Sequence, residues 1–250
     1  MDLRWEILSG YWPLFMSGLL TTIELTLVAI VVGLLLGVVL GLISSSRSAP
    51  PPQSPPARWL LVIVRGITTA YVTFFRGTPL FVQILLVHFA VMPALIHPDN
   101  GLLLSGDMAR TFRQEHGAFF SGCVALSLNA GAYISEIFRA GIQSIHLGQT
   151  QAAWSVGLSH SQAMRFVILP QAFRRMVPAL VNEGVTLIKD SSLVSAIGLA
   201  ELALAARTVA GAYSRYWEPY LAISAMYLIL TLLLSTLAKR LEAPAHLRGR

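Results

Sequence analysis

The chain has 250 residues, of which 55% are apolar and only 12% are charged, and its mean hydropathy is +0.65. This composition excludes an ordinary soluble domain and indicates several membrane-spanning helices. The formal net charge is +6, but no basic run is interleaved with aromatic residues, which argues against a nucleic-acid-binding protein. The single cysteine, Cys123, excludes an intramolecular disulfide, and the six histidines form no metal-ligand pattern.

The apolar residues are grouped into long runs. The first run, 18–43, measures roughly 39 Å as a helix, which is enough to cross the hydrocarbon with some tilt. Residues 1–17 lack the basic start of a signal peptide, so we expect this first span to be retained. Four more apolar regions follow, at 59–92 (interrupted by Arg-Gly-Thr-Pro at 76–79), 119–137, 177–204 and 220–237. The sequence therefore predicts an all-α integral membrane protein with five transmembrane helices.

Five crossings place the two termini on opposite sides of the membrane. If the N-terminus is outside, the inner segments carry ten Lys and Arg residues and the outer segments carry five. The positive-inside rule favours this orientation. The predicted parts are an external N-terminal segment (1–17), a membrane domain (18–241) with an external loop (93–118) and a cytoplasmic loop (144–170), and a cytoplasmic tail (242–250).

Two connecting segments have distinct compositions. Residues 44–56 contain five prolines and five serines, which predicts a short, stiff linker without a packed core. The external loop has mixed polarity. Its amphipathic part, 102–112, fits either a helix on the membrane surface or a plain connector, and we favour the connector.

The most distinctive stretch is the polar segment from Gln151 to Pro170, within the predicted cytoplasmic loop. Gly157 can adopt the left-handed conformation that ends a helix, and Ser159 followed by Gln162 fits a capping box that starts another. The pattern predicts a helix, a turn and a second helix just outside the membrane. Such a surface suits docking to another protein, although an ordinary amphipathic connector shares the local pattern.

Several motifs in the same order resemble those of the membrane-spanning permease subunits of bacterial ATP-binding-cassette importers. The resemblance is to the branch for polar amino acids (histidine, glutamine, glutamate and arginine types), and it covers about 18–241. That family's loop pattern is Glu-Ala-Ala, three residues, Gly, nine residues, Ile-x-Leu-Pro. Here those positions are taken by Gln151, Ala152, Ala153, Gly157, Val167, Leu169 and Pro170, and further similar motifs lie at 76–83, 132–139 and 189–193. The chain departs from the pattern at Gln151, where the family has an acid, and at His146, where it often has proline.

The resemblance implies a type I importer permease fold with a cytoplasmic coupling helix. It also implies an ATPase-docking surface made of Gln151, Ala152, Ala153, Gly157, Ser159, Leu169 and Pro170. Neither lysine of the chain follows a glycine, so it has no Gly-rich phosphate-binding loop. We therefore expect a transport subunit that is not an enzyme and holds no cofactor of its own. The implied partners are two copies of an ATP-binding subunit that bind ATP and Mg²⁺, a second permease chain (identical or paralogous), an external amino-acid-binding protein, the amino acid itself, and the lipid of the bacterial inner membrane.

Ionisable side chains within the apolar runs indicate a substrate path. A charge at the bilayer centre costs about 3 kcal/mol or more, so each should face protein, water or a counter-ion. Glu183 and Asp190 are seven residues apart and share a helix face, where a carboxylate suits a substrate ammonium group. Cationic side chains and backbone amides suit the substrate carboxylate. The predicted path residues are Arg76, Gly77, Thr78, Asn182, Glu183, Thr186, Lys189, Asp190 and Ser191.

Other interpretations of these features stay open. The charges can pair with each other, Arg76 or Lys189 with Glu136 or Asp190, and hold the helices together without a ligand. The break at Thr78-Pro79 either turns backbone carbonyls toward a path or is a simple kink. Two other classes of protein also fit: a self-sufficient secondary transporter or channel, which the lack of an internal repeat disfavours, and an assembly protein without a path. The sequence leaves open which amino acid is carried.

Overall fold

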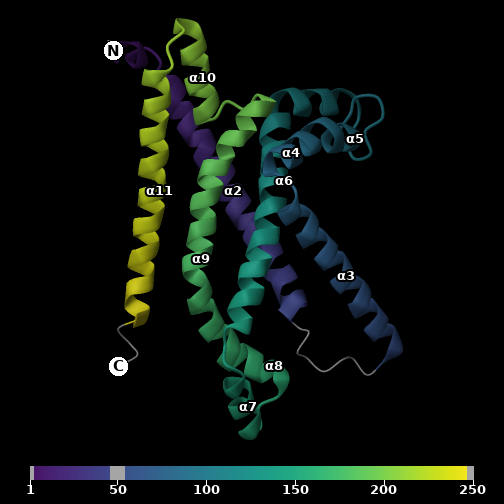
Figure 1. The fold of residues 1–250 in the computed structure, drawn as a ribbon. Helices are drawn as coiled ribbons and strands as arrows, with labels where there is room; N and C mark the ends of the chain where they lie inside the picture. Colours follow the sequence, from purple (N-terminus) through teal and green to yellow (C-terminus); the bar gives the residue numbers. More distant parts are fainter. Residues whose placement is uncertain (1–2, 46–53, 247–250) are drawn as a thin grey trace. The chain divides into compact units, whose positions relative to one another are not determined.

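The computed structural model describes residues 3–45 and 54–246, and these are helical apart from short connections (Figure 1). Four helices are long and apolar enough to cross a membrane: α2 (Trp12–Ser45), α3 (Pro55–Gly77), α6 (Gly106–Gln143) and α11 (Trp217–His246). A bent pair, 160–197 with 202–213, provides a fifth crossing if it counts as one span. The predicted all-α, five-span architecture is confirmed.

Several boundaries differ from those expected. A short helix, α1 (Glu6–Ser9), precedes α2, which begins at Trp12 rather than at residue 18. The interpretation of 102–112 as a plain connector is wrong for its second half, because α6 begins at Gly106 and contains the polar stretch that follows. Arg, Gln and Glu are good helix formers, so the helix continues where the apolar periodicity stops.

Two further predicted segments, the linker at 44–56 and the tail at 242–250, lie partly outside the described residues. The linker prediction at 44–56 is wrong at both described ends, because α2 continues to Ser45 and α3 begins at Pro55; residues 46–53 are not described. The predicted tail from 242 begins within α11, which continues to His246, and residues 247–250 are not described.

The chain divides into two compact units, and each is described by itself. The first consists of 1–31, 79–127 and 184–250. Its remaining elements are α4 (Leu80–Leu86), the π-helix η2 (Val87–Val91), α5 (Met92–Leu95), the 3-10 helix η4 (Ser191–Ile197) and α10 (Leu202–Tyr213). An apolar core joins α2, α10 and α11, and it is formed by Phe15, Leu202, Ala205, Ala206, Val209 and Ile223.

A buried carboxylate closes the break between η4 and α10. Glu201 is fully buried and accepts hydrogen bonds from the backbone N–H groups of Ala203 and Leu204, both at 2.9 Å. The hydroxyl of Tyr227 donates to the same carboxylate at 2.8 Å. Gly18 allows this close packing, because a Cβ there would lie 3.0 Å from the Glu201 carbonyl carbon. Glu201 therefore supplies the acceptors that the first amides of α10 lack.

The second unit consists of 32–78 and 128–183. It contains α3, parts of α2 and α6, α7 (Leu147–Ser155), α8 (His160–Ala163), the π-helix η3 (Met164–Ile168) and the first part of α9 (Leu169–Asp190). Figure 1 shows α7 and α8 together, beyond the ends of α6 and α9. The close packing of α2 on α6 depends on glycine. A Cβ at Gly37 would collide with Ile134, and one at Gly41 would lie 2.5 Å from the Cβ of Phe138.

We predict that Gly37→Val destabilises the protein by about 1–3 kcal/mol, the usual range for overpacking a tight contact. Gly66→Val in α3 is the matched control, because a Cβ at Gly66 meets no heavy atom within 4 Å. Thermal unfolding in detergent, followed by tryptophan fluorescence, measures both variants. Equal melting temperatures for the two variants would contradict the packing of α2 on α6.

Candidate functional site

The polar loop between α6 and α9 begins with a side-chain cap. His146 is the N-cap of α7, and its Nδ1 accepts a hydrogen bond from the backbone N–H of Gly148 at 3.0 Å. His146 stands where the resembling family often has proline. The imidazole thus replaces a fixed φ angle with a hydrogen bond, and the helix still starts at this place.

Gly157 ends α7 as predicted. Its φ is +84°, and two backbone hydrogen bonds close the turn: Gly157 N–H to the Trp154 carbonyl at 2.9 Å, and Leu158 N–H to the Ala153 carbonyl at 3.1 Å. These are the two bonds of a Schellman motif. A residue with a Cβ is strained at this φ, while a Cβ at Gly157 would meet no heavy atom within 4 Å. The requirement for glycine is therefore one of backbone conformation, not of space.

The predicted capping box is also present. The Ser159 hydroxyl accepts from the Gln162 backbone N–H at 3.3 Å, and the Gln162 side-chain oxygen accepts from the Ser159 backbone N–H at 2.8 Å. The second helix then passes through η3, where the Leu169 N–H donates to the Met164 carbonyl, five residues back. Pro170 follows directly and has no N–H to donate. The wider π turn just before Pro170 is compatible with this missing donor. The sequence analysis missed this π-helix, and Pro170 is the signal that could have indicated it.

The residues of the predicted docking surface differ in how exposed they are. Gln151, Ala152, Gly157, Ser159 and Pro170 are exposed, Leu169 is half-buried and Ala153 is buried. Large apolar side chains are also exposed in this part of the unit, with Leu147 at 74%, Trp154 at 49%, Val156 at 77% and Phe166 at 62%. A surface of this kind is typical of a protein contact.

Two side-chain contacts join this loop to the membrane helices. Arg175 of α9 donates to the Ser144 carbonyl, at the end of α6, at 2.6 Å. Gln171 of α9 donates to the Gln149 side chain in α7 at 3.4 Å and to the Val167 carbonyl at 2.8 Å. The start of the loop and its return are thus connected, so α7 is held against the helices that enter and leave it.

A charge cluster lies elsewhere in the same unit. Arg139 binds both carboxylate oxygens of Glu136, at 3.0 and 2.7 Å, and Arg76 of α3 approaches Glu136 at 3.4 Å. Arg76 also lies over the Tyr133 ring, 5.5 Å from its centre. The interpretation that Arg76 pairs within the protein is therefore confirmed for Arg76 and Glu136. Two guanidinium groups share one carboxylate, which leaves a net positive charge.

This cluster lines a cavity of about 500 Å³, together with Thr69, Thr73, Gly77 and Gln143. The cluster residues Tyr133, Glu136 and Arg139 are spaced by three residues along α6 and share one face. The sequence analysis named Glu136 only as a counter-ion and did not assign Tyr133 or Arg139 to a site. Their three-residue spacing was the available signal.

The break at Thr78-Pro79 is a true interruption of the helix. Thr78 and Pro79 have extended backbones, and α4 starts at Leu80. The carbonyls near the break have partners within the protein. Thr78 N–H donates to the Phe74 carbonyl at 3.1 Å, and the Asn129 side chain donates to the Phe75 carbonyl at 3.2 Å. These two carbonyls are therefore satisfied by the protein itself.

The predicted path residues fall into two groups. Arg76, Gly77, Thr78, Asn182 and Glu183 belong to the second unit, and Thr186, Lys189, Asp190 and Ser191 belong to the first. The helix α9 runs from Leu169 to Asp190 and contains Pro178, and the division between the two units falls between Glu183 and Gly184.

The predicted path residues of the first unit differ in how exposed their side chains are. Asp190 and Thr186 are half-buried, Lys189 is exposed, and Ser191 is buried with its hydroxyl donating to the Ile188 carbonyl at 2.7 Å. Asp190 is the last residue of α9 and also the N-cap of η4, so the helical backbone continues past it.

Known proteins with sequences similar to this chain are membrane components of transport systems. The family model described as "Binding-protein-dependent transport system inner membrane component" matches residues 54–244. The arginine transport system permease protein ArtQ of Bacillus subtilis is 35% identical over 92% of this chain and 91% of its own length. The glutamate/aspartate import permease protein GltK of Escherichia coli O6:H1 is 34% identical over 96% of this chain and 97% of its own.

Solved structures show the same similarity. A crystal structure of an amino acid ABC transporter with histidines has a TM-score of 0.77 and 35% identity, covering 98% of this chain and 100% of that one. An inward-facing MetNI methionine ABC transporter shares the fold, with a TM-score of 0.69 and 21% identity, over 92% of this chain and 95% of that one.

The pairing of Glu136 with Arg139 is testable by a double-mutant cycle. We predict that Glu136→Gln and Arg139→Gln each destabilise the protein by about 1–2 kcal/mol, because each removes the charge-assisted hydrogen bonds between two partly buried groups. The double variant should lose less than the sum of the two. Chemical denaturation in detergent measures the three variants, with the exposed pair Glu115 and His116 as a control cycle. Strict additivity at Glu136 and Arg139 would contradict the pairing.

Proposed function

Because this chain belongs to the family of binding-protein-dependent transport system inner membrane components, we propose that it is the transmembrane subunit of an ATP-driven importer for polar amino acids. A separate ATPase subunit, in two copies, binds ATP and Mg²⁺ and docks on the loop 144–170. An external binding protein delivers the amino acid, and a second permease chain completes the path. The N-terminus lies outside and the C-terminus in the cytoplasm of a bacterial cell.

The observation that carries this proposal is the way the loop is built. It presents exposed apolar side chains on a helix that is closed at its start by His146 and at its end by the Schellman turn at Gly157. Arg175 and Gln171 connect that helix to α6 and α9. A partner that pulls on α7 therefore moves the ends of two membrane helices together, as rigid-body switching requires.

The substitution of the family acid by Gln151 changes the chemistry of docking. Gln151 is exposed on α7, and its amide both donates and accepts hydrogen bonds without carrying a charge. Contact with the ATPase then depends less on an ion pair and more on the surrounding apolar side chains. Exposed ion pairs contribute little in water, so this exchange is compatible with docking.

The amino acid class follows from the relatives and from the charges along the chain. ArtQ is named for arginine and GltK for glutamate and aspartate. In the second unit, the excess positive charge beside the Glu136 cavity suits a substrate carboxylate; in the first unit, the half-buried carboxylate of Asp190 suits a substrate ammonium group. Both groups are common to all amino acids, so these contacts recognise the class and leave the side chain of the substrate open.

We predict that Gly157→Val weakens docking of the ATPase, because a β-branched residue at a positive φ costs roughly 1–2 kcal/mol. Gly157→Asn should keep most of the binding, since asparagine tolerates the left-handed region. The measurements are the amount of ATPase that co-purifies with the chain and ATP-driven uptake in vesicles that also contain the binding protein. Membrane insertion should be the same for both variants.

Two results would contradict the proposal. Full co-purification of the ATPase with the Gly157→Val variant would remove the loop from the docking surface. Uptake by this chain in vesicles without ATPase or ATP would instead favour a self-sufficient transporter.

We further predict that Asp190→Asn lowers uptake by at least about tenfold, the usual loss when a charged hydrogen-bond partner is removed. The substitution keeps the shape of the side chain, so folded yield and melting temperature should change little. Asp107→Asn is the control, because the Asp107 side chain is 98% exposed. If the Asp190 variant lost uptake and stability in parallel, the role of Asp190 would be structural and the prediction would be contradicted.

A further inference from the structure

The helix α6 is longer than a membrane crossing requires and has two parts of different character. Its 38 residues measure roughly 57 Å, while the hydrocarbon core is about 30 Å thick. The part 106–117 carries four charged residues and a histidine, whereas 118–143 carries only Glu136 and Arg139. The junction of the two parts therefore lies near the level of the lipid headgroups.

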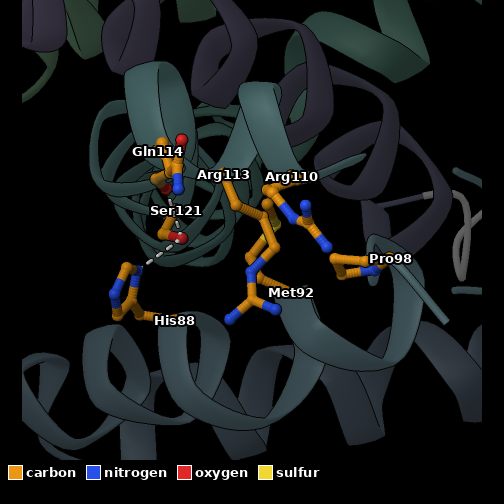
Figure 2. Close-up of a pocket in the computed structure, with 8 residues that line it drawn as sticks. His88, Met92, Pro98, Arg110, Arg113, Gln114 and Ser121 are labelled. Carbon is orange, nitrogen blue, oxygen red and sulfur yellow. Dashed lines mark hydrogen bonds between the residues drawn. The ribbon is translucent and has the colours of Figure 1, made fainter. Parts of the chain in front are cut away.

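A basic pocket opens at this junction, within the first unit. Its volume is about 310 Å³, which is in the range of small-ligand sites. One wall is formed by α6 residues that recur on a single helix face, and the other by residues of η2, α5 and the following loop. The lining consists of Arg110, Arg113, Gln114, Gly117 and Ser121, with His88, Met92 and Pro98 opposite. Figure 2 shows the Arg113 guanidinium extending into the space between the two walls.

The His88 and Ser121 side chains of this pocket are oriented by hydrogen bonds within the protein. The Ser121 hydroxyl donates to the Gly117 carbonyl at 2.7 Å, so its oxygen accepts from Nδ1 of His88, 3.0 Å away (Figure 2). The Nε2 of a neutral His88 is then an acceptor, so the groups that can donate to an anion in this pocket are the guanidinium groups of Arg110 and Arg113. His88 lies in the π-helix η2, and local π-helices are frequent at functional sites.

No acidic side chain in the pocket walls neutralises the positive charge of the pocket. The charge comes from two arginines, and no acid lines the pocket. Arg110 approaches Asp107 at 3.7 Å, but the Asp107 side chain is 98% exposed and outside the lining. Among the described residues, no ion pair within 4 Å involves Arg113. A fork of guanidinium donors without a carboxylate partner matches the geometry of a phosphate group.

On both walls an exposed phenylalanine is next in sequence to a lining residue, and the centre of the Phe89 ring lies 4.8 Å from that of the His88 ring. Phe89 follows His88 and is 64% exposed, and Phe120 precedes Ser121 and is 42% exposed. Met92, which is buried, forms part of the pocket wall itself. Cationic donors beside exposed apolar surface, at headgroup level, fit an anionic amphiphile better than a free ion, because the acyl chains cover the apolar part.

We propose that the pocket between η2 and α6 binds the phosphate of an anionic phospholipid headgroup, with Arg113 as its principal ligand. The site is separate from the docking loop and from the predicted substrate path, and the proposal does not depend on the transport function. Gly117 keeps the floor of the pocket open. A Cβ at Gly117 would meet only the Cβ of Arg113, at an ordinary 3.8 Å, so a larger side chain can be placed there without a clash.

The test uses the full chain in detergent micelles with added phosphatidylglycerol, phosphatidylcholine or inorganic phosphate. Lipid binding is measured by native mass spectrometry and by the shift in melting temperature. We expect phosphatidylglycerol to bind and stabilise the protein, and Arg113→Gln to weaken that binding about tenfold or more, through loss of a charged, two-pronged contact. Arg113→Lys should be intermediate, because it keeps the charge but not the fork.

Gly117→Val provides an independent arm, since it fills the pocket while leaving every charge in place, and it should also reduce phosphatidylglycerol binding. Arg207→Gln is the matched control, an exposed arginine of α10 outside the pocket, and should bind as the unmodified chain does. Equal binding of phosphatidylcholine, or unchanged lipid binding in both pocket variants, would overturn the proposal. Stabilisation by inorganic phosphate with no added effect of phosphatidylglycerol would also overturn it, in favour of a soluble anion.

Discussion

Hydrocarbon offers no water to a backbone amide or carbonyl, so each of these groups must find its partner inside the protein. This constraint explains the polar residues at both breaks described above. The Asn129 side chain meets the Phe75 carbonyl just before the break at Thr78-Pro79. The Glu201 carboxylate meets the first amides of α10, after η4 has ended at Gly198. Because the breaks are satisfied in this way, the chain tolerates non-helical backbone at both places.

The same logic applies to charged side chains. Glu136 is held by Arg139 and approached by Arg76, so no member of this cluster stands alone in an apolar run. Pairing and substrate contact are not exclusive here, because one carboxylate shared by two guanidinium groups leaves positive charge beside a cavity.

The polar loop combines local order with firm attachment. Its helix ends are determined by His146, Gly157 and Ser159 through contacts within a few residues. Its connection to α6 and α9 depends on Arg175 and Gln171, which are more than twenty residues away from their partners. A short helix that is capped at both ends and joined to two membrane helices is suited to transmit a movement. The buried Ala153 contributes to this packing, while Ala152 faces outward.

Local features of this protein were readable from the residues alone. The apolar runs predicted the spans, and Gly157 and the Ser159–Gln162 pair predicted a turn and a cap, because these signals act over one helical turn or reflect transfer into lipid. The extension of α6 to Gly106 was not readable, since polar helix formers carry no apolar periodicity. Only the tertiary structure brought Arg76 to Glu136, Glu201 to Tyr227 and His88 to the arginines of α6. Those contacts join residues far apart in the chain, and which helix faces meet is decided by close packing between helices, as at Gly37 and Ile134, and not by any local pattern.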